Sequence, residues 1–464
     1  MNESISISTE VKQYFSAQAT LAALGMKVCD MKLFEPIKQK VKIAQKTVKY
    51  TPIEKLMDAE IAILAGAHGM VEINKRVRPE RGLQAAFGRN GCAEQSVVQD
   101  TLDACTEENV VQMQAALDLI YRQHSQGYCH NYQKGWQLLD ADMTGRPCGK
   151  KAAFATKGYF AKQRNRRGRQ EGYLIATHYE EIVAKQLFDG KTQLTKALRP
   201  LVEAAEKTLE LDQDEEKRQR TILRMDSGGG SVDDVNWVLK RGYQFHGKDY
   251  SGTRAQNLAE SVVEWFDDPR CPERQVGWVT EKTDIYCRPV KRVAVRCRKK
   301  NGQWGIGVLL STLSPQNVLE LTDQALAKAS DPLAVLLAYV YFYDQRGGGV
   351  ETEIKEDKQG LGSSKRNKKR FTAQHMLALL EALAHNLLVW ARNWLAPLCP
   401  KVARFGMLRL VRDAFHLNGL IVLDQTAHVL KIVFNRADPL AKELHAGFSS
   451  LFAHQHVAIT LGET

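Results

Sequence analysis

The sequence TILRMDSGGGS, residues 221–231, has the pattern of a short buried strand that runs into a glycine-rich turn. Ser231 and Asp234 resemble the capping pair of a helix, so we expect Asp226 at a strand-to-helix junction. Ligands of open α/β sheets gather at such carboxyl ends of strands. The turn lacks the Gly-Lys-Ser/Thr ending of a phosphate-cradling loop, and an acid here can also do no more than cap a turn.

A second strand with acidic residues lies upstream, in WQLLDADMT, residues 136–144. Side chains alternate across a strand, so Asp140 and Asp142 are expected on one face. The pattern favours Asp142 as a metal ligand because it lies nearer the strand end, with Asp140 as the alternative. Three carboxylates from separate elements could hold two Mg²⁺ ions, which require hard oxygen ligands.

The third acid lies downstream in YDQRGGGVETEIKEDK, residues 343–358. This stretch resembles the Tyr-Arg-Glu-Lys signature of bacterial insertion-sequence transposases of the DDE class. The spacings from Tyr343 to Arg346 and from Glu351 to Lys358 match, but four residues instead of three separate Arg346 from Glu351. Glu353 is therefore a rival, although helical geometry favours Glu351, which shares a face with Lys358. We expect the three glycines from 347 to 349 to delay the helix start and absorb the extra residue.

The resemblance covers about residues 136–394 and implies an α/β fold: a ribonuclease H-like mixed sheet flanked by helices. It implies that Asp142, Asp226 and Glu351 bind two Mg²⁺ ions, for which Mn²⁺ can substitute. Tyr343, Arg346 and Lys358 would contact DNA. The implied reaction is metal-dependent cleavage at the terminal inverted repeats of a transposon, followed by 3′-hydroxyl transfer into target DNA, by a homodimer on paired ends.

The charge agrees with a polyanionic partner, because the net charge is +12 and the pI is near 9.1. Residues 143–170 contain nine cations and no acid, and a second basic tract spans residues 365–370. Basic runs are often only solvated surface. Their position beside the acids nevertheless favours DNA contact by Arg164, Arg166, Arg167, Lys355, Lys365, Arg366, Lys368, Lys369 and Arg370.

Hydrophobic patterning predicts three parts. Residues 1–131 are expected to form a helical DNA-binding domain, in which residues 87–98 resemble a turn and a helix whose Gln95 and Ser96 could face bases; a plain helical bundle is the alternative. Residues 132–375 would form the catalytic domain, with three strands and a crossover helix between Asp142 and Asp226 and an inserted β-rich subdomain at about residues 245–312. Residues 376–464 would form a small α/β extension: the rest of a long helix over 373–395 and a small sheet.

Nine scattered cysteines without a Cys-x-x-Cys pair, and the lack of a membrane-spanning apolar run, predict a cytoplasmic protein with no membrane partner. The resemblance implies that this protein is bacterial and nucleoid-associated. Two other function classes remain open. A domesticated or inactive transposase would only bind specific DNA. A junction resolvase would cleave DNA without joining strands.

Overall fold

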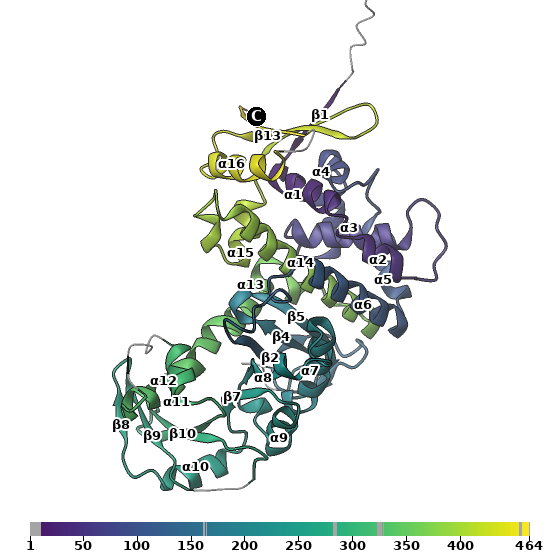
Figure 1. The fold of residues 1–464 in the computed structure, drawn as a ribbon. Coiled ribbons are helices and arrows are strands. Elements are labelled where there is room, and N and C mark those ends of the chain that lie inside the picture. The colour runs from purple at the N-terminus through teal and green to yellow at the C-terminus, as the bar shows by residue number, and fades with distance from the viewer. Residues whose placement is uncertain are drawn as a thin grey trace, which may run out of the picture. The chain divides into compact units, whose positions relative to one another are not determined.

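The structure is a computed structural model that describes residues 11–160, 163, 165–281, 285–322, 327, 329–453 and 457–463. It is a mixed α/β protein that divides into two compact units (Figure 1). Unit 1 combines residues up to 125 with residues 151–153 and 355–464, and unit 2 contains residues 126–150 and 154–354. The boundaries expected at 131 and 375 are therefore replaced, because the N-terminal and C-terminal segments build one unit together.

Unit 1 is mainly helical. Its helices are α1 (Ala19–Asp30), α2 (Glu35–Lys40), α3 (Pro52–Leu64), α4 (Arg81–Ala86), α5 (Gln95–Ala104), α6 (Glu107–His124), α14 (Phe371–Leu395), α15 (Met407–Arg409) and α16 (Ala441–Leu451). The start of α3 shows how local sequence fixes these elements. Thr51 and Glu54 form a reciprocal capping box, and Pro52 occupies the first turn, where its missing N–H costs nothing.

A four-stranded sheet joins the two ends of unit 1. Its order is β1-β12-β13-β14, with β1 at Lys12–Ser16, β12 at Gly419–Leu423, β13 at Val429–Asn435 and β14 at Ala458–Gly462. The expected C-terminal sheet is thus present, but an N-terminal strand completes it. The expected long helix is α14, and most of its residues are buried. Its His385 is a satisfied core residue, because its Nδ1 lies 2.7 Å from Asp357 Oδ1.

Unit 2 is built on one ten-stranded mixed sheet, which runs β3-β4-β2-β6-β7-β11-β10-β9-β8, with β5 also paired to β4. The strands are β2 (Gln137–Pro147), β3 (Thr156–Lys157), β4 (Arg167–Ala176), β5 (Glu181–Asp189), β6 (Thr221–Met225), β7 (Gln244–Lys248), β8 (Phe266–Asp268), β9 (Cys271–Trp278), β10 (Lys291–Arg298) and β11 (Trp304–Ser311). The helices are α7 (Leu194–Leu209), α8 (Glu215–Gln219), α9 (Val232–Lys240), α10 (Gly252–Glu260), α11 (Pro315–Glu320) and α12 (Pro332–Arg346).

The middle of this sheet follows the sequence pattern. β2 and β4 are antiparallel, β6 is parallel to β2, and β7 is parallel to β6. All five residues of β6 are buried, as its apolar composition predicts. Helix α7 covers one face, where Gly172 of β4 faces Leu201. Helix α12 lies against the other face, where Arg224 of β6 contacts Phe342.

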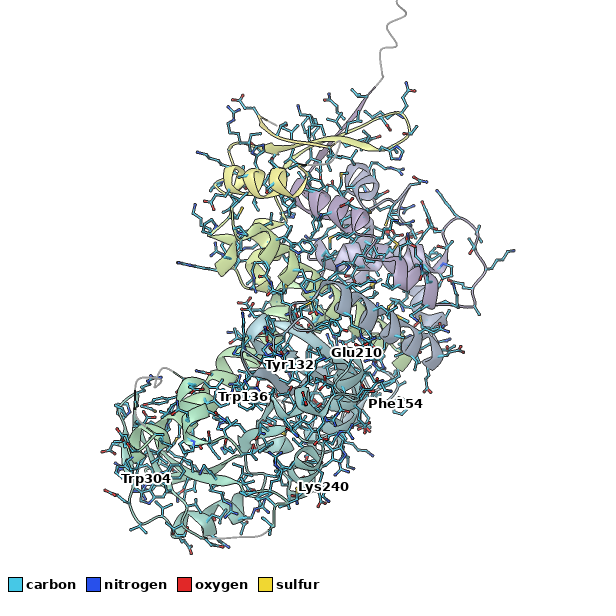
Figure 2. All side chains as sticks on the ribbon, in the orientation of Figure 1. Tyr132, Trp136, Phe154, Glu210, Lys240 and Trp304 are labelled. Carbon is cyan, nitrogen blue, oxygen red and sulfur yellow. The ribbon has the colours of Figure 1, made fainter. Side chains whose placement is uncertain are left out.

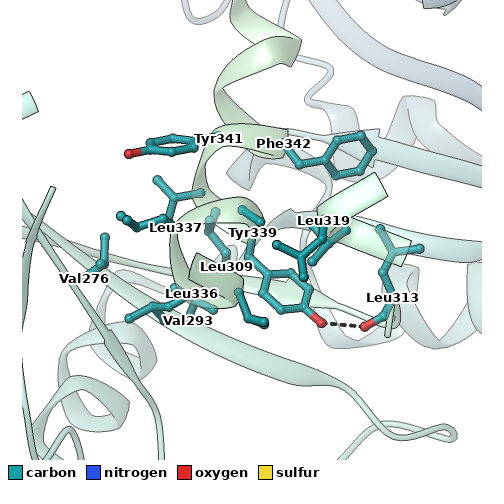
Figure 3. Close-up of a cluster of buried hydrophobic side chains, with 14 of the residues drawn as sticks. Val276, Val293, Leu309, Leu313, Leu319, Leu336, Leu337, Tyr339, Tyr341 and Phe342 are labelled. Carbon is teal, nitrogen blue, oxygen red and sulfur yellow. Dashed lines mark hydrogen bonds between the residues drawn. The ribbon is translucent and has the colours of Figure 1, made fainter. Parts of the chain in front are cut away.

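The β-rich insertion is present but is not a separate subdomain. Strand β11 pairs with β7, so β8 to β11 continue the same sheet beyond its parallel part. Helix α12 packs on these strands, and Leu336 lies among Val276, Val293 and Leu309 (Figure 3). The Tyr339 hydroxyl donates to the Leu313 carbonyl at 2.7 Å. The insertion therefore supplies the support on which α12 rests.

Helix α12 does not end at the three glycines. It continues through a π-helical turn, Gly347–Glu351, into α13 (Thr352–Gly360), within which the boundary between the two units falls. The expected delay of the helix start is wrong. Among the described residues, no helix has both the length and the apolar character needed to cross a bilayer.

Candidate active site

The first two acids are neighbours because of the sheet register. Strands β2 and β6 are parallel, and their last matched pair is Ala141 with Met225. The next residues are Asp142 and Asp226, so two acids follow one another across adjacent strands, whose spacing is about 5 Å. Asp142 Oδ1 accepts from the Met143 N–H at 2.7 Å, and Asp226 Oδ1 accepts from the Gly228 N–H at 2.8 Å. Asp226 therefore also caps its turn, which does not use all of its lone pairs.

The third acid reaches this point from the helix on the same face. Arg346, whose side chain is buried, pairs with both acids: its Nη2 lies 3.2 Å from Asp142 Oδ2, and its Nη1 donates to Glu351 Oε1 at 3.3 Å. The same Nη2 donates to the Ala141 carbonyl at 3.3 Å. In an α-helix, residues five apart do not share a face, whereas a π turn inserts one extra residue. The π turn thus returns Glu351 to the face of Arg346 and compensates for the additional residue in the signature.

The electrostatic environment of Asp142 depends on both of the other acids. Burial, together with repulsion from Asp226 and Glu351, raises the pKa of Asp142 from its ordinary 3.8 to about 6, against the lowering effect of Arg346. Burial would lower the pKa of Arg346, but Asp142 and Asp226 outweigh it and raise that pKa. Three carboxylates face one guanidinium here, so the group carries a formal excess of negative charge when all are ionised.

Asp140 occupies a different environment from Asp142. Its two oxygens accept from Arg224 Nε and Nη2, both at 2.7 Å, and neither side chain is more than 1% exposed. Arg224 also donates from Nη1 to the Phe342 carbonyl at 2.9 Å. Asp140 is thus a buried ion-pair partner that holds α12 on the sheet. Asp140 is therefore not a candidate metal ligand. Asp142, which the sequence favoured, remains the candidate, and its side chain is 15% exposed.

The donor set fits a hard divalent cation, although the acids are not yet arranged around one. Among the described residues, no three Asp, Glu, His or Cys side chains are close enough together to hold a metal ion. Arg346 lies between Asp142 and Glu351 instead, where it supplies part of the missing positive charge. Burial is the largest cause of the raised pKa of Asp142, and repulsion from Asp226 and Glu351 adds to it, so a bound cation would favour the ionised carboxylate. Glu351 rather than Glu353 belongs to this group, because Glu351 contacts Arg346.

Tyr343 is half-buried beside the acids, and it lines a pocket of about 540 Å³ within unit 2. Burial raises the pKa of its hydroxyl to about 12. The charged residues that line the same pocket are Lys248, Arg274, Arg298, Lys299 and Asp344, so cations outnumber acids by four to one. Trp304, labelled in Figure 2, contributes an indole that is 38% exposed.

The basic residues predicted from charge runs divide into two groups. Arg366 and Lys368 are buried: Arg366 pairs with Glu381 and donates to the Ala67 carbonyl, and Lys368 Nζ donates to Gln99 Oε1 at 2.7 Å. Their predicted DNA contact is wrong, because both are needed inside unit 1. Most of the remaining predicted residues are exposed, and Lys358 is partly buried: Arg166, Arg167, Lys355, Lys358, Lys365, Lys369 and Arg370. Arg164 lies outside the described residues.

Two arginines that organise the site were not assigned a role from sequence. Arg224 is the register partner of Asp140, and an alignment of 137–141 with 221–225 as parallel strands would have matched them. Arg274 of β9 donates from Nη2 to Asp344 Oδ2 at 2.7 Å and from Nε to Asp268 Oδ2 at 2.6 Å. It therefore ties the inserted strands to the helix that carries Tyr343 and Arg346. Sequence offered no signal for this pairing, because 70 residues separate its partners.

Comparison with known proteins identifies no family for this chain. Neither a protein-family model nor a curated protein sequence matches this chain. Among solved structures, the chain is similar to the piggyBac transposase in a synaptic complex with hairpin DNA, with a TM-score of 0.39 and 11% identity over 85% of this chain and 79% of that chain. A likeness of this strength does not decide a fold or a function.

Proposed function

We propose that this protein is a DNA transposase of the DDE class, which cleaves DNA at transposon ends and transfers the freed 3′-hydroxyl into target DNA. The observation that carries the proposal is that Asp142 and Glu351 both pair with Arg346, next to Asp226 at the carboxyl end of β6. The transposase signature alone does not explain why four residues, instead of three, separate Arg346 from Glu351. The π turn accounts for that offset by a known helical irregularity that often marks functional sites.

The strand order supports the same proposal. Strands β2, β4 and β5 follow one another in antiparallel pairs, α7 crosses over, and β6 and β7 then lie parallel on the other side of β2. Three strands and a crossover helix between the first two acids are what a ribonuclease H-like core would require. The proposal therefore includes this core for unit 2.

The chain's own residues supply ligands, charge and position. Asp142, Asp226 and Glu351 would hold the divalent ions, which when bound stabilise the attacking and leaving oxygens of a phosphodiester. Once the carboxylates are neutralised, Arg346 is free to donate to a phosphate oxygen. Its Nε is buried and has no hydrogen-bond partner among the described residues, so it retains an unused donor. The basic pocket beside Tyr343 would receive the adjoining backbone.

The decisive test uses a supercoiled plasmid that carries the DNA found on either side of this gene. The wild-type protein with Mg²⁺ or Mn²⁺ should nick the plasmid at defined ends and yield joined products. Asp226→Asn should bind the same DNA and give neither product, because the charge of one ligand is lost while its turn-capping oxygen remains. Cleavage by Asp226→Asn at the wild-type rate would overturn the proposal. Cleavage without joining would indicate a junction resolvase.

A DNA-binding protein without nuclease activity is the second candidate. Arg346 favours it, because its contacts with Asp142 and Glu351 hold these carboxylates in ion pairs. A protein that retards the plasmid ends but never cuts them with either metal would support this candidate. The variant Arg346→Gln separates the cases further. In a nuclease it should bind Mn²⁺ more tightly but react more slowly, whereas in a pure binding protein Mn²⁺ should have no effect on it.

A further inference from the structure

A second basic pocket lies in the helical part of unit 1. It has a volume of about 490 Å³ and is lined by residues of four segments: the loop from 45 to 50, Lys55 of α3, Arg78 and Arg81 at the start of α4, and residues between 90 and 97 at the start of α5. Its lining cations are Lys46, Lys49, Lys55, Arg78 and Arg81, and Glu94 is its one lining acid. Such a charge imbalance within one concave surface favours an anionic ligand.

Four of these cations are available to a ligand. Lys46, Lys49, Arg78 and Arg81 are exposed. Within the described part of the chain, none of the four forms an ion pair. Arg78 lies in the turn before α4, Arg81 is the first residue of α4, and Lys46 and Lys49 lie in a loop, so their charges can pair with an anionic ligand.

The loop with Lys46 and Lys49 is fixed at both ends. At one end, Gln45 Oε1 accepts from Lys55 Nζ at 3.2 Å and from Thr101 Oγ1 at 2.6 Å. At the other end, the Tyr50 hydroxyl fills the space that a side chain at Gly91 would need. The loop is thereby held in place before any ligand binds, which lowers the entropy cost of binding.

The opposite wall is fixed as well. Gln84 donates from Nε2 to the carbonyls of Val77, at 2.7 Å, and Arg78, at 2.8 Å. These two bonds hold the turn that carries Arg78 and leads into α4, where Arg81 lies. The pocket therefore has cations on two segments, each of which is anchored by side-chain contacts.

We infer that this pocket binds the phosphate backbone of duplex DNA, as a contact site separate from the carboxylates of unit 2. The inference rests on the proposed action on DNA. The chain as a whole carries a charge of +12, and a DNA backbone presents regularly spaced phosphates that cations on two walls can contact together. Backbone contacts fix position without reading bases, so a duplex of arbitrary sequence is a sufficient ligand for the test.

The test compares two double variants with a matched control. Lys46→Glu with Lys49→Glu, and Arg78→Glu with Arg81→Glu, each reverse two charges on one wall. The control, Arg436→Glu with Lys442→Glu, makes the same charge change at exposed positions of unit 1 that do not line the pocket. Binding of a fluorescent 40-base-pair duplex is followed by anisotropy at several salt concentrations, and circular dichroism melting checks the fold.

Each pocket variant should bind the duplex about tenfold to a hundredfold more weakly than the control does. The slope of log Kd against log salt should fall by about two, because each lost phosphate contact removes about 0.9 from it. The inference would be overturned if the pocket and control variants lost duplex affinity equally. It would also be overturned if both pocket variants bound the duplex as tightly as the wild type does. Displacement of the duplex by submillimolar ATP would also overturn it, since the pocket would then be a nucleotide site. These outcomes are independent of the Asp226→Asn result, which concerns cleavage.

Discussion

Asp140 and Asp142 are two residues apart on one strand and one face, and each meets an arginine, yet their environments differ. The single charges of Asp140 and Arg224 balance each other through two hydrogen bonds of 2.7 Å, and both side chains are almost fully buried. Asp142 makes one contact of 3.2 Å to an arginine that it shares with Glu351, and it is repelled by Asp226. A matched pair can only hold the fold together, whereas an excess of carboxylates leaves capacity for a cation.

The largest expected effect on activity comes from removing one carboxylate of the group formed by Asp142, Asp226 and Glu351. Asp142→Asn should reduce DNA cleavage at least about a thousandfold, because about 4 kcal/mol of transition-state stabilisation depends on the complete ligand set. DNA binding should persist, and the thermal midpoint should not fall, since the substitution relieves repulsion. Single-turnover cleavage and duplex binding are measured in parallel. A rate within tenfold of wild type would show that Asp142 is no ligand.

Breaking the matched pair should damage the fold instead. Asp140→Ala leaves the buried Arg224 without a counter-charge and should destabilise unit 2 by about 3–5 kcal/mol. Urea unfolding followed by tryptophan fluorescence measures this, because five of the seven tryptophans lie in unit 2. The control, Asp140→Leu combined with Arg224→Met, removes both charges and should recover most of the loss. A single variant as stable as wild type would contradict the structural role of Asp140.

The environment of Asp142 also predicts that native stability and metal affinity depend on pH. The pKa of Asp142 is raised to about 6, so the native protein favours its protonated form, and ionisation costs native stability as pH rises from about 4 to 6. A metal needs the ionised form, so Mn²⁺ affinity should fall about tenfold for each pH unit below 6. The Mn²⁺-induced shift of the thermal midpoint at pH 7 and at pH 5 measures this. Asp142→Asn should remove the dependence, and an equal shift at both pH values would refute it.

The smallest effects concern the π turn that places Glu351. An added Cβ at Gly348 meets no atom within 4 Å, so Gly348→Ala should stabilise unit 2 by about 0.5–1 kcal/mol through a better helix propensity. At Gly349 the new Cβ would lie 2.9 Å from Thr177 Cγ2, so Gly349→Ala should destabilise. The urea concentration at the midpoint of unfolding shows whether each variant is more or less stable than the wild type. Destabilisation by both variants would mean that the turn needs glycine for its backbone.

Local patterns predicted the elements of the site but not its pairing. Apolar runs at 136–144 and 221–225 predicted two strands, and the two-residue period placed both aspartates on one face. Which of them is free depends on the register with β6, which places Arg224 opposite Asp140. Sequence periodicity does not contain that register. The sequence favoured Asp142 with Asp140 as the alternative, and the register adds the reason that Asp140 is paired with Arg224.

Two other features depended on contacts that are distant in sequence. The three glycines predicted a helix start, but Val350 is fully buried, and the helix continues through them as a π turn. The basic run at 365–370 predicted a solvated or DNA-facing tract, but Glu381 and the Ala67 carbonyl draw Arg366 into the core. At the glycines, packing overrides a helix-propensity cost of only about 1 kcal/mol per residue. At Arg366, hydrogen-bond partners that are distant in the sequence make burial of a basic side chain possible.

The pairing of β1 with β12 has a consequence for biosynthesis. A ribosome that has released residue 354 has released all of unit 2, whereas the strand Lys12–Ser16 cannot find its partner until residues 419–423 emerge. Domains generally fold as units during translation, so the ten-stranded sheet of unit 2 can fold before the helical segments that precede it in the chain have all of their partners. Premature termination before residue 419 would leave an unprotected strand edge, which is a template for aggregation.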